Sequence, residues 1–159
     1  MEITTPADDQ ILITREFDAP RHLVYRVWTT PELVRRWWSG HHGTTTEVEL
    51  DLRPGGRWRY VIKTDDGAEV GFHGEYREVV PDERLVYTEV FEQPGVPLDS
   101  VDGPLNTVTF TALDGDRTLL RLLTETGSKE LRDTILQSGM EVGAREQMVL
   151  IQELADSLR

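Results

Sequence analysis

The stretch that decides the fold runs from Phe17 to Trp38 and reads FDAPRHLVYRVWTTPELVRRWW. A strand is expected to end at Phe17 and a helix to begin at Pro20, where a fixed φ angle and a missing N–H cost nothing. Apolar residues then recur at helical spacing as far as Trp28, and Thr30 before a proline predicts the N-cap of a second helix. A strand followed directly by two short helices is typical of a sheet that wraps around other elements.

The middle of the chain shows the period of two that marks half-buried strands. Apolar and polar residues alternate, and turns that contain Asp-Gly or Gly-Gly separate the runs. We expect a meander of antiparallel strands at residues 48–52, 58–62, 70–76, 85–91, 108–110 and 118–126. The loop at residues 92–104 is rich in proline and glycine. It is our candidate for a lid, because unpaired segments at a sheet rim move without breaking a ladder.

The end of the chain is expected to be helical. Ser128 can cap a short helix through Leu136, and Ser138-Gly139 then interrupts the pattern. Apolar residues recur from there at steps of three and four, which predicts a helix over 139–158 of roughly five turns. Such a helix lays its apolar stripe on the inner face of an open sheet. The expected fold class is α+β, with a curved antiparallel sheet wrapped around the long C-terminal helix and two short helices after the first strand.

The composition bounds the class of protein. The 159 residues are expected to form a single domain over 1–159, with residues 1–9 as a loose N-terminal segment. The absence of cysteine excludes disulfides and thiolate chemistry. No stretch reaches transmembrane length and no signal-peptide pattern is present, so a cytoplasmic protein is expected. The formal net charge of −12 argues against nucleic acid and anionic membranes as partners. The oligomeric state is open, and a homodimer is one possibility.

Six groups of residues resemble the motifs of one superfamily in order and spacing, and the similarity as a whole covers about Ile11 to Leu158. They are Thr14-Arg15-Glu16-Phe17-Asp18-Ala19-Pro20, Thr30-Pro31-Glu32-Leu33 with Trp37-Trp38, residues 51–58, residues 71–76, residues 84–89, and Ser138-Gly139-Met140-Glu141-x-Gly143. The chain resembles the START-related helix-grip superfamily (SRPBCC), in the branch named after the heat-shock-chaperone ATPase activator homologues (AHSA-like). It departs from that pattern after the tryptophan pair, where Ser39-Gly40-His41-His42 stands in place of Gly-Pro.

The resemblance implies a START-like domain with a deep, largely apolar pocket between sheet and C-terminal helix. Relatives use this pocket for lipids, polyketides and other small hydrophobic molecules. The residues expected to line it are mostly aromatic, with two thioethers, one small residue and one acid: Trp37, Trp58, Tyr60, Phe72, Tyr76, Tyr87, Glu89, Phe91, Phe110, Met140, Ala144 and Met148. The small Ala144 on the apolar stripe is expected to leave room for a ligand-sized cavity. The alternative for each ring is a packed core, which uses the same residue types.

Glu89 is the candidate catalytic residue. Alternation places it on the face of Leu85 and Tyr87, which we interpret as the inward face. A carboxylate that faces an apolar interior has its charged form disfavoured, and such groups mark functional sites more often than chance. Tyr60 and Tyr87 are the expected hydroxyl partners. The alternative is that Glu89 lies at a strand end, or that the residues on either side of it form the inner set.

No motif for a metal or a cofactor is visible. His41 and His42 are adjacent and cannot both face one site in an extended chain, and His73 has no partner at ligand spacing. The serines lie in no Gly-x-Ser-x-Gly turn. We therefore expect no metal and no cofactor.

Three functions stay open from the sequence. The first is binding of a small hydrophobic molecule, lipid- or polyketide-like, without catalysis. The second is an enzyme of the polyketide cyclase or aromatase type, in which Glu89 and a tyrosine move protons without a metal. The third is a co-chaperone-like protein-interaction role, which rests on the family resemblance alone.

Overall fold

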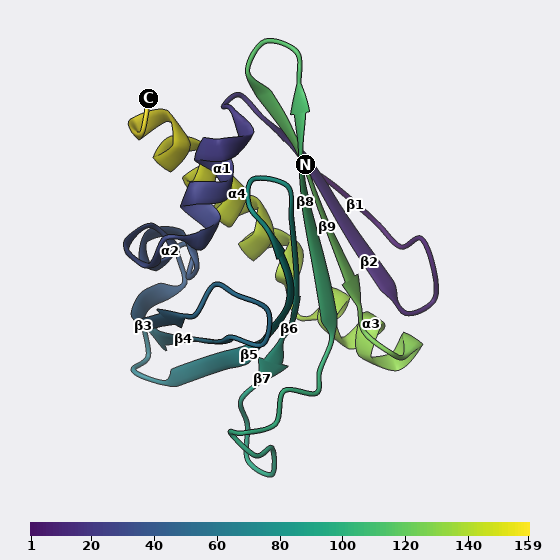
Figure 1. Ribbon diagram of the computed structural model, residues 1–159. Helices are drawn as coiled ribbons and strands as arrows, with labels where there is room; N and C mark the ends of the chain where they lie inside the picture. The colour runs from purple at the N-terminus through teal and green to yellow at the C-terminus, as the bar shows by residue number, and fades with distance from the viewer.

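The computed structural model describes residues 1–159 and consists of one antiparallel sheet curved around a layer of helices (Figure 1). The strands are β1 (Glu2–Thr4), β2 (Gln10–Phe17), β3 (Gly43–Leu50), β4 (Arg57–Thr64), β5 (Glu69–Val80), β6 (Arg84–Thr88), β7 (Val90–Phe91), β8 (Leu105–Leu113) and β9 (Arg117–Glu125). The helices are α1 (Arg21–Thr29), α2 (Pro31–Trp37), α3 (Lys129–Gln137) and α4 (Met140–Ser157). The strand order is β1-β2-β9-β8-β6-β5-β4-β3, and β7 pairs with β5. The predicted α+β class and the tandem helices after the first long strand are confirmed.

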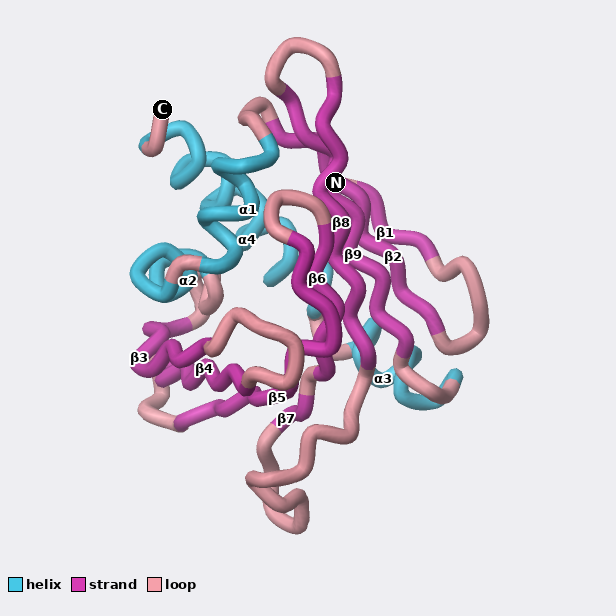
Figure 2. The backbone as a smooth tube through the Cα atoms, viewed as in Figure 1, coloured by secondary structure: helices cyan, strands magenta, loops and turns pink.

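Strand β5 carries the bend of the sheet. Its first half pairs with β4 and its second half with β6, and the register shifts between Tyr76 and Glu78. At the bend, the backbone N–H of Glu75 donates to the Thr88 hydroxyl at 3.0 Å, which replaces a missing ladder bond. Figure 2 shows the result: β3 and β4 run across the direction of β2, β8 and β9. The sheet thereby forms a concave inner face.

Helices α1, α2 and α4 pack together over this inner face (Figure 1). The fully buried core joins the first long strand to the closing helix, with Phe17, Val24 and Ile151 all at 0% exposure. The indole N–H of Trp37 donates to the carbonyl of Val27 at 3.0 Å, which fixes the angle between α1 and α2. The long C-terminal helix therefore lies against the sheet as the three-four periodicity predicted.

The predicted helix starts are correct in position, but one works differently. Ser128 caps α3 as expected, because its hydroxyl accepts from the N–H of Leu131 at 3.1 Å. Gly139, at φ +86°, is the N-cap residue of α4. Thr30 occupies the N-cap of α2, yet its side chain makes no capping bond. The N–H of Leu33, at the third helical position, donates to the backbone carbonyl of Thr30 at 3.0 Å instead of to its hydroxyl.

Two parts of the strand prediction are wrong. Residues 1–9 are not a loose segment throughout, because Glu2–Thr4 forms β1 and pairs with β2, with Ile3 opposite Ile13. The expected strand at 85–91 is broken at Glu89, whose N–H donates to the carbonyl of Pro104 instead of to a neighbouring strand. The chain bends there because β6 pairs with the second half of β5, whereas β7 pairs with the first half.

None of the four helices combines the length and the apolar character that a membrane span requires.

Candidate functional site: an aromatic pocket under the bend of the sheet

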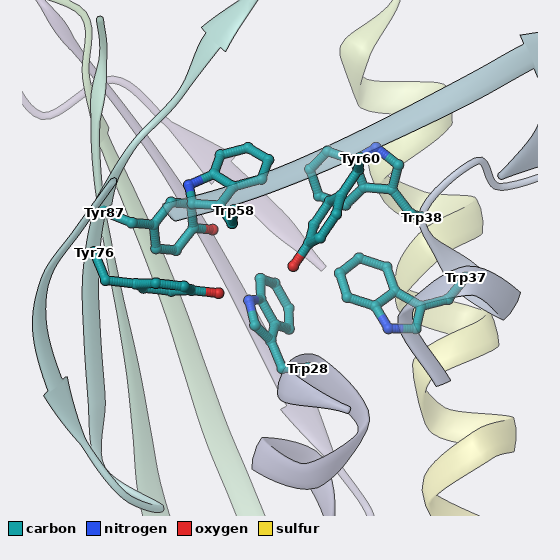
Figure 3. A pocket seen from close by; sticks show the side chains of 7 residues that line it. All are labelled: Trp28, Trp37, Trp38, Trp58, Tyr60, Tyr76 and Tyr87. Atoms are coloured by element: carbon teal, nitrogen blue, oxygen red, sulfur yellow. The ribbon is translucent and has the colours of Figure 1, made fainter. Parts of the chain in front are cut away.

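All four tryptophans and three of the four tyrosines of the chain converge on one space between the sheet and the helices (Figure 3). We call this space the aromatic pocket. It is lined by Trp28 from α1, Trp37 and Trp38 from α2 and its C-cap, Trp58 and Tyr60 from β4, Tyr76 from β5 and Tyr87 from β6. The rings meet edge-on or tilted, for example Trp38 on Tyr60 at 4.9 Å between centroids. Such geometry is favoured for aromatic pairs and stabilises the cluster beyond its buried area.

The volume of the aromatic pocket is about 10 Å³. That is room for about one water molecule. The expected ligand-sized cavity is therefore not formed in this arrangement of the side chains. The physical reason is that Trp28 and Trp38, which were not among the expected lining residues, project into the space between the sheet and the helices. A ligand larger than water requires one of these rings to move.

Trp38 is the tryptophan with the weakest anchor. The indole N–H groups of Trp37 and Trp58 each donate to a backbone carbonyl at 3.0 Å. The indole N–H of Trp38 is buried without any partner, although the residue as a whole is only half-buried. A buried donor without a partner costs roughly 1–3 kcal/mol. The closed position of Trp38 therefore carries a penalty that its two neighbours do not.

Tyrosine hydroxyls lie among the apolar walls of the pocket. In Figure 3 the hydroxyls of Tyr60 and Tyr76 point toward the ring of Trp28, in the middle of the cluster. Burial raises the pKa of Tyr76 to about 12, and it raises the pKa values of Tyr60 and Tyr87 well above the ordinary value of 10. The neighbouring hydroxyls and Glu89 contribute to the shifts of Tyr60 and Tyr87. The phenols are therefore neutral, close to one another and able both to donate and to accept hydrogen bonds.

Glu89 lies close to this cluster but does not line the pocket. Its negative charge acts on the hydroxyls of Tyr60 and Tyr87, the two partners expected from the sequence. Leu85 and Tyr87 belong to the core cluster whereas Val86 and Val90 do not, so alternation identified the inward residues of β6. Glu89 itself lies at a strand end, between β6 and β7, which is the alternative interpretation of the sequence. Part of Glu89 stays exposed, yet burial raises the pKa of its carboxyl from 4.5 to about 7, with no opposite charge or hydrogen bond to offset the effect. At neutral pH this acid is divided between its neutral and ionised forms.

The other expected lining residues lie around the pocket or further away. Five of the twelve line it directly: Trp37, Trp58, Tyr60, Tyr76 and Tyr87. Phe110, Ala144 and Met148 are buried in the surrounding core, and Phe72 and Met140 pack partly buried against that core. Phe91 is 49% exposed and stacks on Phe72 at 5.4 Å, outside the pocket. A usable signal for the two missed tryptophans was present, since Trp28 ends the apolar face of α1 and Trp38 belongs to the tandem pair.

The opposite face of β4 and β5 carries a network of charges, which we call the outer network. Arg59 donates two hydrogen bonds to Glu92 at 2.8 and 2.9 Å and one to Glu47 at 3.1 Å. The ring of His73 lies between the Glu92 carboxylate at 2.8 Å and the carbonyl of Ser100 at 2.7 Å. Arg59 is the main cause that lowers the pKa of Glu92, and His73 adds to it. The network connects Glu92 and Ser100 of the loop at 92–104 to the outer face of the sheet.

An open cleft of about 310 Å³ lies beside the outer network, under the exposed Leu98 of the loop. The loop contacts this face through Glu92 and Ser100, on the side of the sheet away from the aromatic pocket. Its role as a lid stays a prediction. No group of three or more His, Asp or Glu side chains is arranged as metal ligands are. His42 and the backbone N–H of His41 both contact Glu146 of α4, at 3.1 and 3.0 Å.

Comparison with solved structures finds bacterial proteins that share this fold over nearly the whole chain. A crystal structure of a protein from Rhodobacter sphaeroides matches with a TM-score of 0.87 at 22% identity, over 99% of both chains. Protein Ms6760 from Mycobacterium smegmatis matches with a TM-score of 0.86 at 25% identity, over 100% of this chain and 99% of that one. Protein NE0264 from Nitrosomonas europaea matches at 0.82 and 22% identity, over 95% and 96%.

A search of curated proteins gives no match. The family model described as "Activator of Hsp90 ATPase homolog 1-like protein" matches residues 18–156, which include every residue of the aromatic pocket. The chain belongs to this family, a branch of the SRPBCC proteins with the helix-grip fold.

Proposed function

We propose that this protein binds a small, largely apolar molecule in the aromatic pocket. The observation that carries the proposal is the convergence of all four tryptophans and three of the four tyrosines on one space. Ligand pockets are mostly lined by apolar and aromatic side chains with a few placed polar groups, and this pocket has both. Membership in an SRPBCC family, whose fold often holds hydrophobic ligands, supports the same function.

Entry of a ligand requires a ring to leave, and Trp38 is the best candidate. It is half-buried, its N–H has no partner, and its ring contacts Trp58, Tyr60 and Phe72 edge-on. A rotation of this side chain toward the rim would free the orphan N–H to reach water and would open the space that the ring now fills. The filled pocket is then the unliganded state of a binding site, in which Trp38 occupies the position of the ligand.

Native mass spectrometry of protein purified from its own source tests the proposal. A ligand that stays bound should appear as an added mass that disappears on denaturation. Titration with ethylbenzene, followed by the four indole N–H signals in a ¹H–¹⁵N spectrum, tests the same site without a natural ligand. Replacing Trp38→Ala should strengthen ethylbenzene binding, because an apolar cavity left by a large side chain takes up such molecules.

Leu98→Ala, which truncates a residue that is 67% exposed on the loop, is the matched control and should change nothing in that titration. The proposal is wrong if no mass is added and if Trp38→Ala gains no affinity for ethylbenzene while it stays folded.

A second candidate function, proton transfer of the cyclase or aromatase type, is supported by Glu89. An acid whose pKa is about 7 beside two neutral tyrosine hydroxyls is suited to both take up and release a proton at neutral pH. Glu89→Gln keeps the shape and removes the titration. A carrier should bind its ligand nearly as well after this change, whereas an enzyme should lose on the order of a hundredfold or more in rate.

A co-chaperone-like role has less support. The family description names an ATPase activator, which speaks for an interaction with a protein. A docking surface would need a contiguous apolar patch, whereas the five exposed large apolar side chains are spread over β7, the loop, α3 and α4. Single exposed apolar residues are normal on protein surfaces.

A further inference from the structure

We infer that the aromatic pocket selects an apolar ring that carries one neutral oxygen, and that this oxygen lies among the hydroxyls of Tyr60, Tyr76 and Tyr87. The inference rests on the proposed ligand-binding function and names the chemical class of its ligand. A phenol is the simplest member of that class.

The first argument is the direction of the polar atoms. Three tyrosines reach the pocket from three strands, β4, β5 and β6, and their hydroxyl ends meet in the interior while their rings form the wall (Figure 3). The free space there holds about one water, which needs two to four polar partners of this kind. The oxygen of a ligand can use the same partners, because a phenolic hydroxyl both donates and accepts.

The second argument excludes a hydrocarbon as the preferred ligand. A hydrocarbon placed among the tyrosine hydroxyls would leave buried hydroxyls with fewer partners, at a cost of roughly 1–3 kcal/mol for each unsatisfied group. Sites built to hydrogen-bond a hydroxyl discriminate strongly against the analogue that lacks it for this reason.

The third argument excludes an anion. The seven lining residues include no arginine, lysine or histidine, so a carboxylate in the pocket would be desolvated without a counter-charge. Glu89, which acts on the hydroxyls of Tyr60 and Tyr87, would repel it when ionised. A quaternary ammonium is disfavoured by the orientation of the tyrosines, since cations bind over the faces of aromatic rings, whereas Tyr60 and Tyr76 present their hydroxyl ends.

The test compares four small probes that differ in polarity and charge: 4-ethylphenol, ethylbenzene, 4-ethylbenzoate and tetramethylammonium. Binding to the whole protein is measured by the shifts of the four indole N–H signals, which report on the wall of the pocket. We expect 4-ethylphenol to bind about tenfold more tightly than ethylbenzene, which corresponds to one or two net hydrogen bonds. We expect no binding of 4-ethylbenzoate or of tetramethylammonium in the same range.

Tyr60→Phe and Tyr87→Phe remove the hydroxyl and keep the ring, so they should abolish the preference for 4-ethylphenol without weakening ethylbenzene. Tyr25→Phe is the matched control. Tyr25 is the one tyrosine outside the pocket lining, its buried hydroxyl has no partner, and its removal should leave the preference intact.

Equal binding of 4-ethylphenol and ethylbenzene would overturn the inference and leave the proposed function standing. Tightest binding of 4-ethylbenzoate or tetramethylammonium would overturn it in favour of a charged ligand. If none of the four probes shifts an indole signal up to its solubility limit, the proposed binding function fails together with the inference.

Discussion

The outer side of strands β4 and β5 and the pocket on their inner side place polar groups in opposite situations. On the outer face, Arg59 and His73 have partners on every side, through Glu92, Glu47 and the carbonyl of Ser100. On the inner face, the N–H of Trp38 has no partner, and the carboxyl of Glu89 is desolvated without compensation. Neighbouring residues in the sequence alternate between these two environments, because successive side chains of a strand point to opposite faces.

The paired groups and the unpaired groups call for different explanations. Buried polar groups in folded proteins are normally satisfied, so a fully paired network such as the outer one is explained by stability and by the anchoring of a loop. Unpaired buried groups that gather in one place need another explanation, and perturbed acids are concentrated at functional sites. We therefore propose the inner face as the functional face.

Truncation of the tandem tryptophans should give the largest effects and the clearest contrast within the inner face. Trp37→Ala should lower the free energy of unfolding by about 3–5 kcal/mol, because this ring is 2% exposed and holds α1 to α2. Trp38→Ala should cost about 2 kcal/mol or less, since the residue is half-buried and its removal relieves an orphan N–H. Urea unfolding of both variants measures the difference, and equal losses would show that Trp38 is an ordinary core residue.

The pH dependence contributed by Glu89 should be the next largest effect. Its pKa in the folded state is about 7, above the ordinary 4.5, so the folded protein holds the proton more tightly than the unfolded chain. The free energy of unfolding should therefore fall as the pH rises from 4.5 to 7, by at most about 3 kcal/mol, and then stay level. Comparison of wild type with Glu89→Gln by urea unfolding at several pH values isolates this contribution. Parallel pH profiles for the two proteins would contradict it.

Loss of a charge from the outer network should have a smaller effect and the opposite pH sign. Glu92→Gln should cost about 1–2 kcal/mol at pH 7, because Arg59 and His73 lose their anionic partner. The pKa of Glu92 is lowered in the folded protein, so the loss should be full above pH 4.5 and should vanish as the pH falls through the folded value.

Glu49→Gln, on an exposed position of β3 with no ion pair, is the control for that variant. Neither change should move the indole signals of the aromatic pocket. If Glu92→Gln shifts them as strongly as an inner-face variant does, the two faces are coupled and their separation is wrong.

Most of the fold was predictable because it depends on periodicity. The alternation in β4 and β5 and the three-four stripe of α4 are local patterns, and they fixed the class and the position of the elements. The break at Glu89 could not be read, since it follows from the pairing of β5 with two different partners, which is a property of the bent sheet. The strand at Glu2–Thr4 was missed because three residues are too few for a pattern.

The site was predictable in composition but not in volume. Alternation placed Trp58, Tyr60 and Glu89 on the inner face. The structure has Trp58 and Tyr60 in the pocket wall, whereas Glu89 lies at the end of β6 and does not line the pocket. The filling of the cavity depends on the rotamer of Trp38 and on the angle between two helices, and no local pattern encodes either. The outer network was equally hidden, because Arg59, His73 and Glu92 meet only after the loop folds back on the sheet.

The most direct test of an unpaired acid on the inner face is an NMR titration of the Glu89 side-chain carboxyl, assigned by comparison with Glu89→Gln. A midpoint near pH 7 is the expected result, because the carboxyl is desolvated beside Tyr60 and Tyr87 with no cation to stabilise its charge. A midpoint near the ordinary 4.5 would place the carboxyl in water and would contradict the assignment of this face as the functional one.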